Sequence, residues 1–180
     1  MTDYWLITWQ GAAGGTFVAR VAAADRDAGD AGRVSCVIDP LAGARVFKLL
    51  PVAIADNKAE YRLVTSDEAD FDREVLDRYH VTVTCVDRGT PPLSANASLE
   101  VLVSDVNDND PHLSRRHYVF RVAENSRRST ELGTIVADDP DLGPSGSVSF
   151  SLESREAESS ESDVVHVDPE TGVVTLEAGL

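Results

Sequence analysis

The chain has 180 residues, of which 42% are hydrophobic and 26% charged, so its composition is that of a globular protein, not a disordered one. Asp and Glu number 31 against 16 Lys and Arg, and the formal net charge of −15 argues against nucleic acid and anionic membrane surfaces as partners. This length accommodates one domain or two small ones.

The first ten residues lack the basic start and the long apolar run of a secretory signal peptide. The sequence contains no run of about 18 apolar residues, so no membrane span is predicted in it. We therefore expect either a cytosolic protein or a piece of a longer secreted chain. Trp5 and Trp9 are interpreted as an N-terminal hydrophobic anchor or, preferably, as accidental or poorly ordered sequence, and whether residues 1–10 are native sequence stays open.

An internal repeat organises the chain. A shift of 114 positions (139 − 25) places Asp25-Arg26-Asp27 on Asp139-Pro140-Asp141, with both aspartates matched. The same shift aligns three further pairs: Gly32 with Gly146, Val34-Ser35 with Val148-Ser149, and Gln10 with Glu124. Because such ungapped agreement is rare by chance, we expect two repeats, at 8–110 and, incomplete, at 111–180.

Strand-like alternation of apolar and polar residues recurs at Tyr79–Cys85, Leu99–Val103 and Tyr118–Val122. Turn-forming residues follow at 88–92, 141–144 and 168–172. Short strands separated by such turns, with no convincing helical period, predict an all-β fold of tandem β-sandwich domains. The acidic, Ser-rich segment 153–163 is predicted to be a solvated loop.

The segment Asp105–Pro111 holds five Asp or Asn residues in seven positions and no Lys, Arg or His. Two carboxylates about 4 Å apart repel by about 4 kcal/mol at an effective dielectric constant near 20, so the cluster favours water or a cation. Oxygen-only ligands suit Ca²⁺ better than Zn²⁺. The plain alternative is an acidic Asx-rich turn.

An EF-hand is the rival calcium site, because Asp105, Asn107 and Asn109 match its alternating ligand positions. The sixth position is Asp110 where glycine is required, and the twelfth is Arg116 where a bidentate glutamate is required. The predicted flanks are also strands, so the EF-hand is rejected.

Two other acidic turns can contribute ligands to a joint between the repeats. Asp72-Arg73-Glu74 precedes the strand at Tyr79, and Asp139-Pro140-Asp141 begins the equivalent turn of the second repeat. With Asn107 and Asp108 they supply enough oxygens for more than one calcium ion of six to eight ligands.

These motifs together resemble a pair of cadherin repeats of protocadherin-like type. The matching residues are Asp72-Arg73-Glu74, the run Asp105–Pro111, the two Asp-x-Asp pairs, Ala123-Glu124-Asn125 and Asp87. The resemblance implies Greek-key β-sandwich domains, the second truncated, with an open sheet edge and an exposed core. It also implies calcium at the linker that joins the repeats.

The resemblance further implies a role for each residue of that linker. Asp72, Glu74 and Asp108 would bind two ions, helped by the Val106 carbonyl and Asp141. A third ion would be held by a second set that shares Asp141 with the first, namely Asn107, the Asn109 carbonyl, Asp139, Asp141 and the Ser145 carbonyl. Asp25, Asp27 and Asp87 would form a half-site for an earlier linker, and Glu124 one for a later linker. Gln10 is a departure, since the family has a glutamate there.

Two smaller features complete the sequence. Cys36 and Cys85 fall in phase with core-facing residues. The resemblance places their strands side by side, which permits a disulfide, but two buried free thiols are the preferred prediction. Asn96-Ala97-Ser98 is a glycosylation sequon that matters only in a secreted chain.

No catalytic motif is recognisable, so the chain is not expected to be an enzyme or to take a small-molecule substrate. The resemblance implies the extracellular part of a membrane-anchored protein at the plasma membrane. Its implied function is calcium-dependent, homophilic cell–cell adhesion, with a cadherin-type ectodomain of the same or a related protein on an apposed cell as partner. The alternatives are a non-adhesive, calcium-stiffened spacer and a soluble calcium-binding protein.

Overall fold

The computed structural model of the chain describes residues 5–40, 45–153 and 164–177. These residues form twelve strands and one short 3-10 turn, Gly29–Gly32, which confirms the all-β prediction. The chain divides into two compact units, Met1–Val106 and Asn107–Leu180. In the described part of the chain, no helix is long and apolar enough to cross a membrane.

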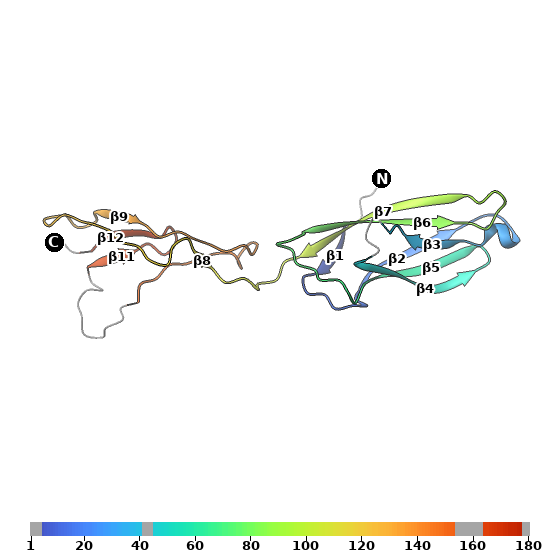
Figure 1. The fold of residues 1–180 in the computed structure, drawn as a ribbon, viewed down its shortest axis with the longest axis horizontal. Coiled ribbons are helices and arrows are strands. Elements are labelled where there is room, and N and C mark those ends of the chain that lie inside the picture. The colour runs from blue at the N-terminus through green and yellow to red at the C-terminus, as the bar shows by residue number, and fades with distance from the viewer. Residues whose placement is uncertain (1–4, 41–44, 154–163, 178–180) are drawn as a thin grey trace. The chain divides into compact units, whose positions relative to one another are not determined.

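The first unit is a sandwich of two sheets. One sheet has the order β1-β7-β6-β3, in which β1 (Trp5–Trp9) runs parallel to β7 (Ser94–Ser104). The other pairs are antiparallel, with β6 at Arg78–Val86 and β3 at Ser35–Ile38. The second sheet has the order β2-β5-β4, with β2 at Phe17–Ala24, β5 at Lys58–Thr65 and β4 at Phe47–Ala55. In Figure 1, β6 and β7 lie above β2, β4 and β5.

The core of the first unit lies between the two sheets and follows the period of two expected of strands. Val81 and Val83 from one sheet and Ala59, Tyr61 and Leu63 from the other are at most 5% exposed. Three aromatic rings close one end of this core, with Phe71 5.6 Å from Phe47 and 5.3 Å from Tyr79, centroid to centroid. Rings at such separations and tilted angles pack favourably.

Two predicted strands of this unit are confirmed, since Tyr79–Cys85 lies in β6 and Leu99–Val103 in β7. The interpretation of Trp5 and Trp9 as poorly ordered sequence is wrong, because both belong to β1 and pair with β7. Their strand adds to the edge of an existing sheet, and a ladder formed with residues a hundred positions away gives no local sequence signal.

The prediction of free thiols is also wrong. Cys36 and Cys85 are directly opposite each other in the β3–β6 ladder and form a disulfide. The prediction that both face the core holds, since Cys36 is buried within it and Cys85 packs against it. The register between the two strands, which places the two side chains opposite each other, decides the bond.

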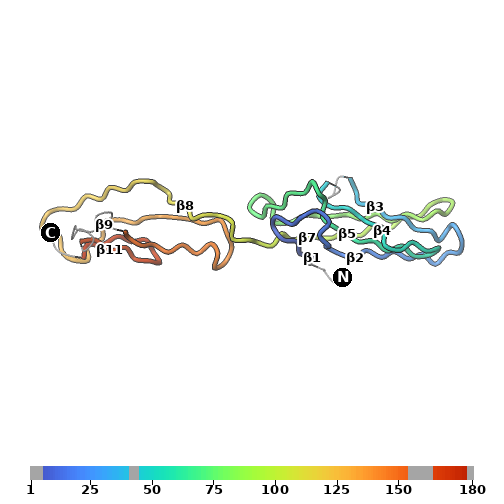
Figure 2. The backbone as a smooth tube through the Cα atoms, turned by 90° about the horizontal axis from the view of Figure 1, so that it is seen from below, coloured from blue at the N-terminus to red at the C-terminus, as the bar shows by residue number. Residues whose placement is uncertain are grey.

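The second unit repeats one sheet of the first. Its three-stranded sheet has the order β11-β12-β9, with β9 at Glu131–Thr134, β11 at Val165–Val167 and β12 at Val173–Leu176. The 114-position shift carries β2 onto β9 and β5 onto β12, so the order of β2-β5-β4 is reproduced (Figure 1). Figure 2 shows the backbone of each unit from below. A two-stranded ladder joins β8 (His112–Leu113) to β10 (Ala137–Asp138).

The predicted strand Tyr118–Val122 is not formed, although these residues are described. The shift places it opposite β1, whose partner in the first unit is β7. A strand needs a neighbouring ladder, so its alternating pattern is insufficient here. The predicted loop at 153–163 lies outside the described residues except for Glu153, which is in no strand.

The repeat extends to the conformation of the turns. Gly11 and Asn125, which correspond under the shift, have φ values of 65° and 71°. The turns that contain them are closed by corresponding backbone hydrogen bonds. In the first turn the amide of Ala12 donates to the carbonyl of Trp9, and in the second Ser126 donates to Ala123. Asn tolerates this left-handed region better than most residues, which explains its use in place of glycine.

Candidate metal centre

Each unit contains an Asp-x-Asp loop built in the same way. In the second unit the Asp141 amide donates to Oδ1 of Asp139 at 2.9 Å, and in the first the Asp27 amide donates to Oδ1 of Asp25 at 2.8 Å. This Asx-turn folds the chain tightly just after a strand. Both loops also need a glycine, because a Cβ on Gly146 would lie 2.0 Å from the Asp141 carbonyl oxygen. The equivalent distance for Gly32 is 2.1 Å.

Asp141 is the centre of an acidic cluster in the second unit. It is only 6% exposed, and its carboxylate accepts hydrogen bonds from the Asn109 side chain at 2.7 Å and the Asn109 amide at 3.3 Å. The Asn109 side chain also donates to Asp108 at 3.0 Å. The acidic run is therefore folded against the Asp-x-Asp loop, with amide groups between the carboxylates.

The remaining predicted ligands of the second unit lie around this cluster. Asp139 belongs to it through its hydrogen bond to the Asp141 amide. Ser145 lies in the tight turn 143–146 that follows the loop, and Asn107 is exposed. The structure brings Asp108, Asn109 and the two aspartates together, while no hydrogen bond between described residues adds Asn107 or Ser145 to them.

A second acidic cluster forms in the first unit. Asp72 begins a tight turn in which its Oδ1 accepts from the Val75 amide at 3.0 Å, and this turn presents Arg73 and Glu74. Carboxylate oxygens of Glu74 and Asp105 lie within 4.8 Å of each other. Arg73 lies between them and forms an ion pair with each. Val106, whose carbonyl is a predicted ligand, follows Asp105 directly and is 42% exposed.

Arg73 provides the positive charge in this cluster. Desolvation lowers its pKa, but the hydrogen bond to Asp105 and the charges of Glu74 and Asp105 outweigh it, so the pKa is raised. Neither Arg73 nor the Asp105 side chain is among the ligands predicted from the sequence. The charge alternation in Asp72-Arg73-Glu74 is the available signal, since an arginine between two acids can hold them at close range.

Gln10 also belongs to the cluster of the first unit. Its Nε2 donates to Oε2 of Glu74 at 3.0 Å. The tight turn at Gln10–Gly11 delivers this side chain from the end of β1. A neutral amide therefore occupies the position where a glutamate would add another carboxylate.

The other predicted half-sites are separate from these clusters. Asp25 and Asp87 line one pocket of about 170 Å³ in the first unit. Asp87 is 8% exposed, and its Oδ1 accepts from the amides of Gly89 at 2.8 Å and Leu93 at 2.9 Å. Glu124 lies in the turn of the second unit that corresponds to Gln10–Gly11, and Asn96 is exposed on β7.

The donor chemistry of the two clusters fits calcium. Their side chains offer carboxylate and amide oxygens, with no imidazole or thiolate among them, which is the ligand set of a hard cation. Within each unit a cation would be held by that unit's own cluster, the Asp-Arg-Glu turn with Asp105 in the first and the Asp-x-Asp loop with Asp108 in the second. Bound calcium would neutralise these carboxylates and coordinate several of them at once.

Comparison with known proteins identifies the repeats. A family model described as the cadherin domain matches residues 10–104 and 118–180. Human protocadherin gamma-B4 is 38% identical over 161 residues, which is 89% of this chain and 16% of that protein. Human protocadherin gamma-B3 is also 38% identical over 161 residues, with the same coverage. The chain thus spans about a sixth of these relatives' length.

Solved structures give the same result. The protocadherin gamma-B4 extracellular domain matches with a TM-score of 0.81 and 31% identity, covering 97% of this chain and 26% of that one. Extracellular cadherin domains 3–6 of protocadherin gamma-B2 match with a TM-score of 0.81 and 35% identity, covering 96% and 39%. These protocadherins belong to a non-enzymatic family, which confirms the prediction that the chain is not an enzyme.

Proposed function

The chain belongs to the cadherin family, and we propose that calcium binds where its two repeats join and makes them a rigid part of a cell-adhesion ectodomain. Its homology to protocadherins, which are membrane proteins with extracellular cadherin domains, supports an extracellular position. The partner we propose is a cadherin-type ectodomain, of the same or a related protein, on an apposed cell.

One observation carries this proposal. Each unit gathers carboxylates into a cluster, and both clusters include residues of one continuous segment. Asp105 belongs to the cluster of the first unit, and Asp108 and Asn109 belong to that of the second. Only Val106 and Asn107 separate them in the chain. Carboxylates fixed on either side of so short a connection can serve the same ions.

The proposed ligands are those predicted from the sequence. Two calcium ions are bound by Asp72, Glu74, Asp108 and Asp141 with the Val106 carbonyl. A third calcium ion is bound by Asn107, Asp139 and Asp141 with the carbonyls of Asn109 and Ser145. Without calcium, the like charges repel and the linker bends freely. With calcium, the same groups become shared ligands and the linker stiffens. The affinity expected for such an extracellular module is a Kd of about 10⁻⁴–10⁻³ M.

Two measurements on the chain test the calcium part. Thermal melting in a calcium titration should show Tm rising over the millimolar range, because calcium binds the folded state. Small-angle scattering should show that the spread of linker conformations narrows over the same range. Magnesium at equal ionic strength is the control. The calcium proposal fails if Tm does not respond at millimolar concentration.

Adhesion is tested separately. Beads coated with an ectodomain that contains these repeats should aggregate in calcium and disperse in chelator. If beads still aggregate after these two repeats are replaced by two unrelated cadherin repeats, the proposal that these repeats mediate adhesion is contradicted. The chain then remains a calcium-stiffened spacer, provided that the calcium titration succeeds.

A further inference from the structure

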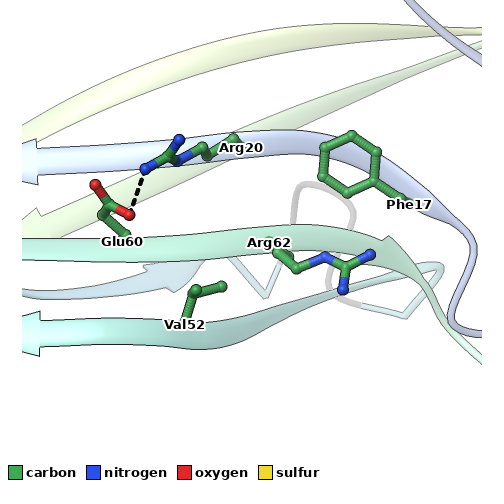
Figure 3. A pocket seen from close by; sticks show the side chains of 5 residues that line it. All are labelled: Phe17, Arg20, Val52, Glu60 and Arg62. Atoms are coloured by element: carbon green, nitrogen blue, oxygen red, sulfur yellow. Dashed lines mark hydrogen bonds and ion pairs between the residues drawn. The ribbon is translucent and has the colours of Figure 1, made fainter.

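The outward side of the β2-β5-β4 sheet carries a mixed apolar and charged surface, which we call the Arg62 face. Five residues line a pocket of about 460 Å³ on it, namely Phe17, Arg20, Val52, Glu60 and Arg62 (Figure 3). Phe17 is 51% exposed and Val52 58%. The alternate residues of β5, Tyr61 and Leu63, point into the core, so Glu60 and Arg62 point outward. Two apolar side chains beside three charged ones thus leave a mixed surface that a partner could cover.

The charges on this face are not balanced by the fold alone. The register of β2 and β5 places Arg20 opposite Arg62, an arrangement of like charges that destabilises a sheet. Arg20 is compensated by Glu60, with Nη2 and Oε2 2.5 Å apart. Arg62 extends away from that pair in Figure 3 and lies over the Phe17 ring, 5.2 Å from its centroid. Among the described residues no carboxylate forms an ion pair with Arg62.

The β4 edge of the same sheet is less suited to binding a partner than the Arg62 face is. β4 is an edge strand, and Leu50 and Val52 on it are 46% and 58% exposed. Between them stands Pro51, which has no backbone N–H and so cannot complete a ladder with an added strand. A partner is therefore expected to pack on the face and not to extend the sheet at β4.

We propose that the Arg62 face docks on the same face of a second copy of this chain about a two-fold axis. Glu60 and Arg62 are two residues apart on one side of β5, so a two-fold axis between them brings each Arg62 to Glu60 of the other copy, whose carboxylate it then shares with Arg20 of that copy. The exposed Phe17 and Val52 provide the apolar contact. This proposal rests on the homophilic function proposed above and names a surface for it.

A second copy fits this face better than an anionic glycan. A polyanion would meet Glu60 and two apolar side chains as well as the arginines, on a chain whose net charge is −15. A copy presents a complementary acid, base and apolar group at once. Since two such copies repel each other overall, association is expected to be stronger when calcium neutralises their acidic clusters.

Sedimentation velocity of the chain in millimolar calcium tests this proposal through a charge exchange. Arg62→Glu alone and Glu60→Arg alone should each weaken self-association by about tenfold or more, because like charges then meet across the axis. An equimolar mixture of the two variants should restore association, since every contact becomes an acid facing a base. Arg78→Glu and Glu100→Arg make the same charge changes on the other sheet and should have no effect.

Each result decides the proposal. It is overturned if the wild-type chain stays monomeric, if the single variants associate normally, or if mixing restores nothing. Retention of a monomeric chain on heparin that depends on Arg62 would assign the face to a glycan instead and also overturn it. Thermal melting of each variant verifies folding. Beads that aggregate regardless of Arg62→Glu would leave homophilic adhesion standing and remove this face from it.

Discussion

Gln10 donates a hydrogen bond to Glu74, with Nε2 and Oε2 3.0 Å apart. The residue that corresponds to Gln10 in the second repeat is Glu124, and both lie in turns with the same backbone hydrogen bond. Position 10 is thus directed at the acidic cluster of the first unit but carries no charge of its own. Calcium affinity at this linker should therefore be lower than a full set of carboxylates would give.

Gln10→Glu should strengthen calcium binding by about tenfold, which corresponds to about 1.4 kcal/mol, because it adds a carboxylate next to Glu74. In chelator the same variant should melt at a lower temperature than the wild type, since the added charge repels Glu74. Isothermal titration calorimetry and thermal melting measure the two effects. Gln10→Ala is the control, and an affinity for Gln10→Glu no higher than for Gln10→Ala would contradict the prediction.

Asp141→Asn should weaken calcium binding by about tenfold or more, because it removes one charge from the buried centre of the second cluster. The replacement keeps the size of the side chain, so the fold should persist. Calorimetric titration with calcium measures the change. Asp168→Asn removes a carboxylate from a separate turn of the same unit and should leave the affinity unaltered. An equal loss of calcium affinity in both variants would mean that the affinity depends on the total charge of the chain and not on a site at Asp141.

Loss of the disulfide should destabilise the first unit by about 4 kcal/mol in the chain-entropy treatment, given the sequence separation of 49 residues. The double variant Cys36→Ser, Cys85→Ser and the reduced wild type should both unfold at lower denaturant concentration. Denaturant titrations with and without reductant measure this difference. Alkylation of the unfolded, unreduced chain provides the independent check, and labelling of two thiols would show that the bond is absent.

Asp168 should make the second unit sensitive to acid. Hydrogen bonds from Thr171 and Glu170 lower the pKa of its carboxyl from the ordinary 3.8. A folded-state pKa below that of the unfolded chain means that the ionised carboxylate stabilises the fold above about pH 4. That contribution is lost as the pH falls through the lowered pKa. Asp168→Ala should therefore be less stable than the wild type at pH 7, and the difference should shrink in acid.

The measurement for this prediction is the free energy of unfolding of both proteins across that pH range. Glu170→Ala serves as the control, since only the Glu170 amide takes part in the turn. A difference between wild type and Asp168→Ala that stays constant down to pH 2 would contradict the assignment.

Local sequence patterns predicted the parts of this protein whose cause is local. Alternation over Tyr79–Cys85 predicted a strand because half of its residues face the core whatever their partner. The Asp-x-Asp loops repeat in sequence because each needs an Asx-turn and a glycine at a fixed spacing. The proposed ligands could be named because the same motifs carry the resemblance to cadherin repeats, which implies their roles.

The tertiary structure decided what depends on register and on pairing between distant residues. Cys36 and Cys85 form a bond because two strands place them opposite each other, and Trp5–Trp9 is a strand because β7 offers it an edge. Tyr118–Val122 has a good strand pattern and no ladder, since a strand exists only with a neighbour. Likewise, the pairing of Arg73 with Asp105 and the approach of Gln10 to Glu74 join residues far apart in the chain. Composition and spacing determine which groups are present, and packing determines which of them meet.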